Sequence, residues 1–408
     1  MDSTDELQSK ERRCNLKDQS AGGLECLPQE ILLDIFSRLP ISSVLQLKFV
    51  CRGWRNLARD PHFTKMHISH MAKSNPCLIF YSNQPIEKQL YFVDLYARRD
   101  KEAVVKKIYP QFSTVMPKFE VIGSCNGLLC LCDPENTHAL FICNPFTRDY
   151  KELPKGPELN RDHDVIFGFG CHPTTKEYKV IRIINYRNRY RAPRCCRFVG
   201  MQTEVQVLTV GDVTWRSLGE CPYLLLNWSS PVLVNGRLHW VTWPVRYGPK
   251  HMLVSFDLAD EQFREVPRPE CGALDMYRYN LFLLRGCLSA AVIRYYRQVD
   301  IWVMKEYDVK ESWVKEIRIG TYVPRALEES IGEKTFGIQK RFSNGPFLKI
   351  LCLLETGEYL LEYENRTLVS YDPRREVFND LKFQGLPESY GIVVHFGSLT
   401  SEVSLFNV

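Results

Sequence analysis

The chain has 408 residues, which is too long for a single small domain and long enough for a minor domain followed by a large one. Hydrophobic residues make up 45% and charged residues 25% of the composition, the balance of a soluble globular protein. The net charge of +5 is spread over a large surface and does not by itself indicate a nucleic-acid-binding protein.

The N-terminal sequence is polar and charged and has no apolar segment of the kind found in a signal peptide. No later run reaches the roughly 18 apolar residues that a membrane-spanning helix requires. The 15 cysteines are an odd number, and none show the C-x-x-C spacing of zinc or thioredoxin sites. We therefore expect reduced cysteines in an intracellular protein, located in the cytoplasm, the nucleus or both.

Residues 27–54 carry more apolar surface than so short a helical unit can bury alone. Apolar positions between residues 31 and 36 follow one face of a first helix, which ends at Leu39-Pro40. A second apolar run covers residues 44–50, and a third short helix carries Trp54. Three short amphipathic helices cannot close a core of their own, so this unit needs a partner.

This pattern resembles the F-box, the helical motif by which substrate receptors of SCF ubiquitin ligases bind a Skp-family adaptor. The matching positions agree in order and spacing, and they are Leu27-Pro28, Glu30, Ile31-Leu32, Ile35-Phe36, Leu39-Pro40, Val44-Leu45, Val50-Cys51-Arg52 and Trp54-Arg55. The alternative is an ordinary helical cap on the domain that follows.

The resemblance implies a set of apolar residues that would be buried against the adaptor. They are Leu27, Pro28, Ile31, Ile35, Leu39, Leu45, Val50 and Trp54.

From about residue 75 to the C-terminus, short apolar runs alternate with turn signals. Asn235-Gly236 lies between VLV and RLHWV and is a strong hairpin signal, and Thr356-Gly357 lies between LCLL and YLLEY in the same way. Helical periodicity is almost absent. The sequence therefore predicts that this part is all-β and that the protein is mainly β.

A faint repeat runs through the β part. An Asn or Asp at the end of a strand is followed by turn residues, then by an aromatic residue, and three residues later by an aliphatic one. The clear copies are Asn144, Tyr150 and Leu153; Asp257, Phe263 and Val266; and Asp372, Phe378 and Leu381, with looser copies at Trp215 and Leu218 and at Asp308, Trp313 and Ile317. The aromatic positions 150, 215, 263, 313 and 378 are separated by 65, 48, 50 and 65 residues, around the roughly 50 of a kelch blade.

The repeat predicts a β-propeller of five or six blades, because each four-stranded unit buries its faces only against its neighbours. Closure of the ring would require residues 392–399 or 403–406 to pair with the first or the last blade. A large β-sandwich or an irregular barrel built from the same hairpins is the alternative.

This second part resembles the F-box-associated domain of plant F-box proteins, a kelch-like β domain. The residues that carry the resemblance are GSCNGLL at 123–129, Tyr178-Lys179-Val180, VNGRLHW at 234–240, Ser255-Phe256-Asp257, DIWVM at 300–304 and Ser312-Trp313. With both resemblances, we expect a disordered tail at residues 1–24, a three-helix F-box at 25–66 and an F-box-associated β domain at 75–408.

The family implies a substrate receptor of an SCF-type ubiquitin ligase that catalyses nothing itself. Its F-box would bind the Skp-family adaptor and, through it, a cullin scaffold and a RING subunit, while the β domain would hold a target protein for ubiquitination. No cofactor is implied.

Catalytic and metal-binding patterns are weak in this sequence. Gly168-Phe169-Gly170 leads into Cys171-His172-Pro173 instead of a helix that could hold a phosphate. His163, Cys171 and His172 lack a fourth ligand at a recognisable spacing, so we predict no metal site. Among the aromatic residues, only Trp243 remains open as a stacking site.

Arginines crowd the segment RIINYRNRYRAPRCCR, interleaved with Tyr186 and Tyr190. Arginine beside aromatic side chains is typical of sites that bind phosphate or carboxylate, and the alternative is a solvated loop. The predicted target-binding residues are Arg187, Arg189, Arg191 and Arg194. They would contact an acidic or phosphorylated segment of the target. The rival functions are a propeller hydrolase or oxidase, a non-degradative interaction scaffold and an RNA-binding module that uses this loop, although nucleic acid is not the expected partner.

Overall fold

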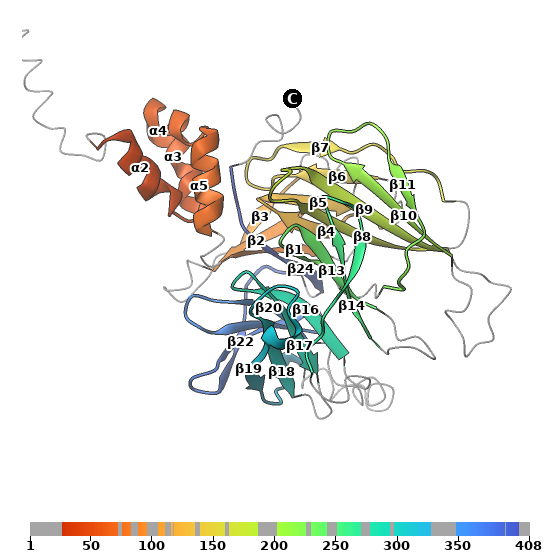
Figure 1. Ribbon diagram of the computed structural model, residues 1–408. Coiled ribbons are helices and arrows are strands. Elements are labelled where there is room, and N and C mark those ends of the chain that lie inside the picture. The colour runs from red at the N-terminus through yellow and green to blue at the C-terminus, as the bar shows by residue number, and fades with distance from the viewer. Residues whose placement is uncertain are drawn as a thin grey trace, which may run out of the picture. The chain divides into compact units, whose positions relative to one another are not determined.

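The computed structural model divides the chain into two compact units, Met1–Met71 and Ala72–Val408 (Figure 1). The described residues are 27–71, 76–82, 89–95, 105–110, 116, 118–134, 139–159, 163–186, 202–225, 230–242, 251–270, 278–293, 298–327, 348–387 and 389–399. The expected tail at residues 1–24 lies outside the described residues.

The described part of the first unit is helical. Its helices are α2 (Gln29–Ser37), α3 (Ile41–Val50), α4 (Arg52–Leu57) and α5 (Pro61–Met71). We expected three helices and missed α5. Its sequence, PHFTKMHISHM, alternates apolar residues with histidine, lysine and serine and therefore shows only a weak apolar stripe.

Polar contacts hold α5 against the end of α2. The Oγ atom of Ser37 lies 2.9 Å from Nδ1 of His70, and Nε2 of His67 lies 3.0 Å from the carbonyl oxygen of Leu39. Phe63 of α5 is fully buried, and burial lowers the pKa of His67. The fourth helix is thus part of the core of this unit.

The second unit is a β-propeller of six four-stranded antiparallel sheets, so the propeller prediction is confirmed and the sandwich and barrel alternatives are excluded. Blades 2 to 6 each use four consecutive strands, starting at β4, β8, β12, β16 and β20. The strands are β1 Cys77–Ser82, β2 Leu90–Asp94, β3 Val105–Ile108, β4 Glu120–Cys125, β5 Leu128–Cys132, β6 Leu140–Cys143, β7 Tyr150–Glu152, β8 His163–Cys171, β9 Tyr178–Tyr186, β10 Gln202–Thr209, β11 Arg216–Gly219, β12 Val232–Val234, β13 Arg237–Val241, β14 Leu253–Asp257, β15 Phe263–Val266, β16 Arg278–Leu284, β17 Cys287–Ile293, β18 Val299–Met304, β19 Trp313–Ile319, β20 Leu348–Leu353, β21 Tyr359–Tyr363, β22 Thr367–Asp372, β23 Val377–Leu381 and β24 Tyr390–His395, with a 3₁₀ turn, η6, at Lys310–Ser312.

Blade 1 is completed by the C-terminal strand. In Figure 1 the dark blue β24 lies beside the orange β1, and the two strands pair antiparallel from Ser82 opposite Tyr390 to Cys77 opposite His395. β24 is the inner edge of this blade, next to β4 of blade 2 and β20 of blade 6. Of the two runs considered for closure, residues 392–399 overlap β24, whereas residues 403–406 lie outside the described residues.

The segment after β24 is bound to blade 2. The side chain of Asn144 donates to the carbonyl oxygen of Ser398 over 2.9 Å, and Ser398 Oγ donates to the carbonyl oxygen of Asn126 over 3.0 Å. Gly127 has a φ of +83°, and a Cβ atom there would collide with Ser398. The glycine of the NGLL sequence is therefore needed for ring closure.

The repeated Asn or Asp forms the turn between the two outer strands of a blade. Its Oδ1 atom accepts the N–H group two residues later in the turns that begin at Asn144, Asp257 and Asp372. The residue four positions after it has a positive φ, namely 67° at Arg148, 59° at Glu261 and 56° at Glu376. The Asx turn thus explains why Asn and Asp recur at this position.

The repeated aromatic residue lies at the start of the outermost strand, and the two tryptophans in this position link neighbouring blades. Nε1 of Trp215 in blade 3 donates to the carbonyl oxygen of Pro154, which follows blade 2, over 2.8 Å. Trp313 of blade 5 makes the same bond, also 2.8 Å, to Pro267 after blade 4. Both tryptophans are therefore architectural.

Other motifs also serve the packing of the blades. A Cβ atom on Gly168 would lie 2.7 Å from Leu238, so the G-x-G sequence permits close contact between blades 3 and 4. In VNGRLHW, Arg237 pairs with Asp257 over 2.9 Å, and Nε2 of His239 lies 2.7 Å from the hydroxyl of Tyr307. Burial lowers the pKa of His239 to about 4.

Glu362 on β21 gives the propeller a specific pH dependence. Its carboxyl is buried, Oε1 has no hydrogen-bond partner among the described residues, and burial raises the pKa from 4.5 to about 7. A raised folded-state pKa contributes stability that is present below pH 4.5 and is lost as the pH rises to about 7.

We expect Glu362→Gln to stabilise the protein at pH 8, by on the order of 3 kcal/mol, and to have little effect at pH 5. Chemical denaturation at the two pH values measures this difference. The exposed Glu355→Gln is the control and should behave as wild type at both. An equal effect of Glu362→Gln at pH 5 and pH 8 would contradict the prediction.

Candidate functional site

The helical unit exposes most of the apolar side chains that the sequence assigns to adaptor binding. Leu27 is 37% exposed, Ile31 48%, Ile35 38% and Val50 57%. Pro28 is also exposed, whereas Leu39, Leu45 and Trp54 are half-buried. Large exposed apolar side chains gathered in one small unit are typical of a binding surface.

Helix α2 has two apolar sides with different environments. Leu32 and Phe36 are buried in the unit, whereas Ile31 and Ile35 are exposed. Residues four apart lie one turn above each other on a helix, so Ile31 and Ile35 form a short apolar row on the surface. Helix α2 therefore supplies both core and uncovered apolar surface.

Phe49 at the end of α3 is a candidate that sequence reasoning missed. It is 70% exposed, more than Leu27, Ile31, Ile35 or Val50, and Nζ of Lys48 lies 5.2 Å from its ring centroid. The signal was present in the sequence, because residues 44–50 contain too many apolar positions for one buried helix face.

Trp54 contributes to the internal packing of the unit as well. Its ring centroid lies 4.6 Å from that of Phe36 in an edge-on arrangement. Its backbone N–H donates to Sγ of Cys51, the residue that caps α4. A substitution at Trp54 would therefore disturb the fold of the unit in addition to any interface.

A salt bridge lies beside the exposed row of α2. The guanidinium of Arg38 donates to the carboxylate of Asp34 over 2.8 Å, and this hydrogen bond holds the pKa of Asp34 below its usual value. Asp34 therefore remains charged at neutral pH and adds a polar border to the apolar surface.

The four arginines assigned to target binding, Arg187, Arg189, Arg191 and Arg194, lie outside the described residues. The residues on either side of their segment are described, and Tyr186 pairs with Gln202 across β9 and β10. Arg182 is fully buried within β9, and its Nη1 donates to the carbonyl oxygen of Pro157 over 3.4 Å. Arg182 is thus part of the blade and not of the loop, which the sequence pattern alone did not reveal.

The strands that precede two of the candidates predicted from the sequence end on the same side of the propeller, by the topology of the blades. The arginine segment follows β9, and Trp243, which lies outside the described residues, follows β13. Both strands are second strands of neighbouring blades and therefore run in the same direction. The short Asx turns lie at the opposite ends of the strands.

Among the described residues, no group of three or more His, Cys, Asp or Glu side chains could hold a metal ion. His172, considered as a ligand, instead accepts the backbone N–H groups of Thr174 and Thr175 through Nδ1, each over 3.3 Å. None of the helices in the described ranges is long and apolar enough to cross a membrane.

Comparison with known families identifies both units. Residues 75–398 match the family described as F-box associated beta propeller domain, and residues 24–69 match the F-box-like family. The chain is a plant-type F-box protein with an F-box-associated propeller. The match to residues 24–69 includes most of α5, so the F-box of this protein contains a fourth helix.

This F-box protein is similar to several proteins of Arabidopsis thaliana. It is 46% identical over 392 residues to "F-box protein At3g07870", with 93% of each chain covered. It is 28% identical to "F-box protein CPR1", covering 91% of this chain and 88% of the other. It is 25% identical to "F-box/kelch-repeat protein At3g23880", covering 72% and 79%.

Proposed function

We propose that this F-box protein is the substrate-recognition subunit of an SCF-type ubiquitin ligase. Its helical unit binds a Skp-family adaptor, which connects it to a cullin scaffold and a RING subunit, and its propeller binds the target protein. The observation that carries the proposal is the uncovered apolar surface of the F-box, with Ile31, Ile35, Phe49 and Val50 all exposed.

The energetics of this surface support a protein partner. Burying one large aliphatic or aromatic side chain contributes roughly 1.5–3 kcal/mol. Four such side chains contribute enough to offset a substantial part of the entropy lost on association. Interface energy concentrates in a few buried anchors of this kind.

The proposed role requires no catalytic group in this chain. A receptor that holds the target beside the ubiquitin-charged enzyme raises the effective concentration of target lysines near the thioester. The protein would act where its target is found, in the cytoplasm, the nucleus or both.

One contact with the target is assigned to the arginine segment that follows β9. We expect the replacement of Arg187, Arg189, Arg191 and Arg194 by Ser to leave adaptor binding unchanged and to slow ubiquitination of the target. High salt should have a similar effect on the wild type, because exposed charges are screened over about 8–10 Å at physiological ionic strength.

Proximity labelling in plant cells identifies the target for this test. Proteins labelled by both the full-length chain and its β domain should carry ubiquitin only when the chain also contains the F-box. If the arginine variant and the wild type ubiquitinate such a target equally, the arginine segment is a solvated loop that does not contribute to target binding. Targets whose ubiquitination does not depend on the F-box would contradict the ligase function itself.

A further inference from the structure

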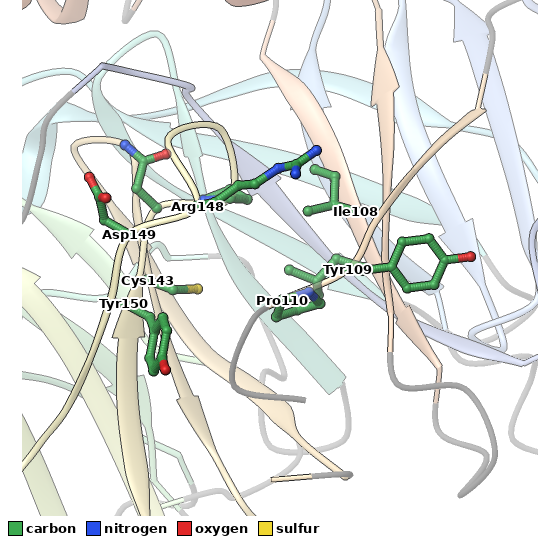
Figure 2. Close-up of a pocket in the computed structure, with 10 residues that line it drawn as sticks. Ile108, Tyr109, Pro110, Cys143, Arg148, Asp149 and Tyr150 are labelled. Carbon is green, nitrogen blue, oxygen red and sulfur yellow. The ribbon is translucent and has the colours of Figure 1, made fainter. Parts of the chain in front are cut away.

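A surface hollow lies between blades 1 and 2 of the propeller (Figure 2). Blade 1 contributes residues from β2 and from the end of β3, and blade 2 contributes the Asx turn between β6 and β7. The lining residues used below are Ile108, Tyr109, Pro110, Arg148, Asp149 and Tyr150.

The hollow is a shallow contact surface and not a cavity for a small molecule. Its enclosed volume is about 10 Å³, the space of about one water molecule. Tyr109 is 64% exposed and Tyr150 is 41% exposed, and Pro110 is buried in the wall between them. Tyrosine is enriched at protein-recognition surfaces because its ring offers a large, rigid contact area.

Tyr150 departs from the pattern of the other blades. It occupies the repeated aromatic position, at which Trp313 is buried and Trp215, Phe263 and Phe378 are half-buried. Elsewhere this side chain packs within or between blades, as the Trp215 and Trp313 hydrogen bonds show. In blade 2 the ring of Tyr150 lies 6.3 Å from that of Phe141, between centroids, and is also exposed at the hollow.

Arg148 departs from the pattern in the same turn. In blade 4 the equivalent residue is Glu261, which pairs with Lys179 and Arg216 of blade 3, each over 2.7 Å. Arg148 forms no ion pair with any residue in the described ranges. The turn does not require a cation, because Glu261 and Glu376 hold this position with the same positive φ.

The orientation of the side chains leaves the charge of Arg148 directed at the hollow. In Figure 2 the guanidinium of Arg148 extends towards Ile108, whereas the carboxylate of Asp149 points in the opposite direction. An arginine beside exposed tyrosine rings is suited to an anionic group followed by an apolar one.

We propose that this hollow binds an extended segment of the target protein, in which a carboxylate side chain pairs with Arg148 and an adjacent apolar residue packs against Tyr109 and Tyr150. The inference rests on the proposed function, since it assigns a docking site for the target. It commits to Asp or Glu as the anion and not to a phosphorylated residue.

Selection from a phage-displayed library of random peptides on the full-length protein tests this site. We expect enriched peptides to contain Asp or Glu next to an aliphatic, aromatic or prolyl residue. In fluorescence-polarisation titrations, the best peptide should bind Arg148→Gln about tenfold more weakly than wild type, the loss of one charge-assisted hydrogen bond. Tyr109→Ala should also weaken it, whereas Lys176→Gln, in the turn between β8 and β9 of blade 3, should not.

Several outcomes overturn the proposal. The first is that the selection does not enrich peptides with an acidic residue next to an apolar one. The second is that the best peptide binds wild type and Arg148→Gln with equal affinity. The third is that this peptide binds more tightly when its Asp or Glu is replaced by phosphoserine. Adaptor binding is measured on the same preparations. Any of these three outcomes with intact adaptor binding refutes this site alone, whereas absence of adaptor binding refutes the proposed function.

Discussion

A chain truncated after Gly391 should lose the cooperative unfolding transition of its propeller. The truncation removes residues 392–395 of β24 and the segment that binds blade 2 through Ser398. Blade 1 loses its inner strand, and the apolar cluster between blades 6 and 1 loses Ile392. The lost pairing and burial are of the same order as the roughly 5–15 kcal/mol by which a typical domain is stable.

Calorimetry or circular dichroism measures this effect. A chain that ends at residue 399 is the matched control, because it keeps β24 and Ser398 and should retain the transition. If truncation after Gly391 leaves the thermal transition where it was, closure by β24 is not what stabilises the ring.

Charge introduced on the exposed row of α2 should abolish adaptor binding. We expect Ile31→Glu with Ile35→Glu to weaken binding on the order of 100-fold or more, because each carboxylate would be buried against an apolar partner. The milder Leu27→Ala with Pro28→Ala should weaken it strongly as well, by removing two proposed anchors. Titration with a purified Skp-family adaptor measures both variants.

The control for this experiment is Val213→Glu. Val213 is an 82% exposed apolar residue of the propeller, so its substitution introduces a carboxylate at an exposed apolar position without changing the F-box. If the Ile31 and Ile35 variant and Val213→Glu both bind the adaptor as tightly as the wild type does, the exposed row is not the contact surface.

Much of the fold follows from local sequence signals. Asn144 and Asp257 mark turns because their side chains satisfy backbone N–H groups a few residues away, which a sequence pattern can reveal. Tandem four-stranded units then require a closed ring. Which C-terminal run closes it depends on pairing between residues about 300 positions apart, such as Cys77 and His395, and the sequence offered two candidates.

The candidate sites were less accessible to sequence reasoning. Spacing placed Ile31, Leu32, Ile35 and Phe36 on helical faces, yet only tertiary packing separates the buried pair from the exposed pair. Helix α5 was missed because its burial depends on α2. The hollow beside Arg148 could not be predicted from the sequence, because it forms where two blades meet. Arg148 and Tyr150 also occupy repeated turn positions, and in other blades the residues at these positions contribute to packing and ion pairs.

Binding of a Skp-family adaptor by the F-box is the central claim about this protein. Isothermal titration of the full-length protein with a purified adaptor tests it most directly. We predict one-to-one binding with a negative heat-capacity change, because apolar side chains such as Ile35 and Phe49 become buried. Absence of binding heat at several temperatures, together with separate elution of the two proteins in size-exclusion chromatography, would contradict it.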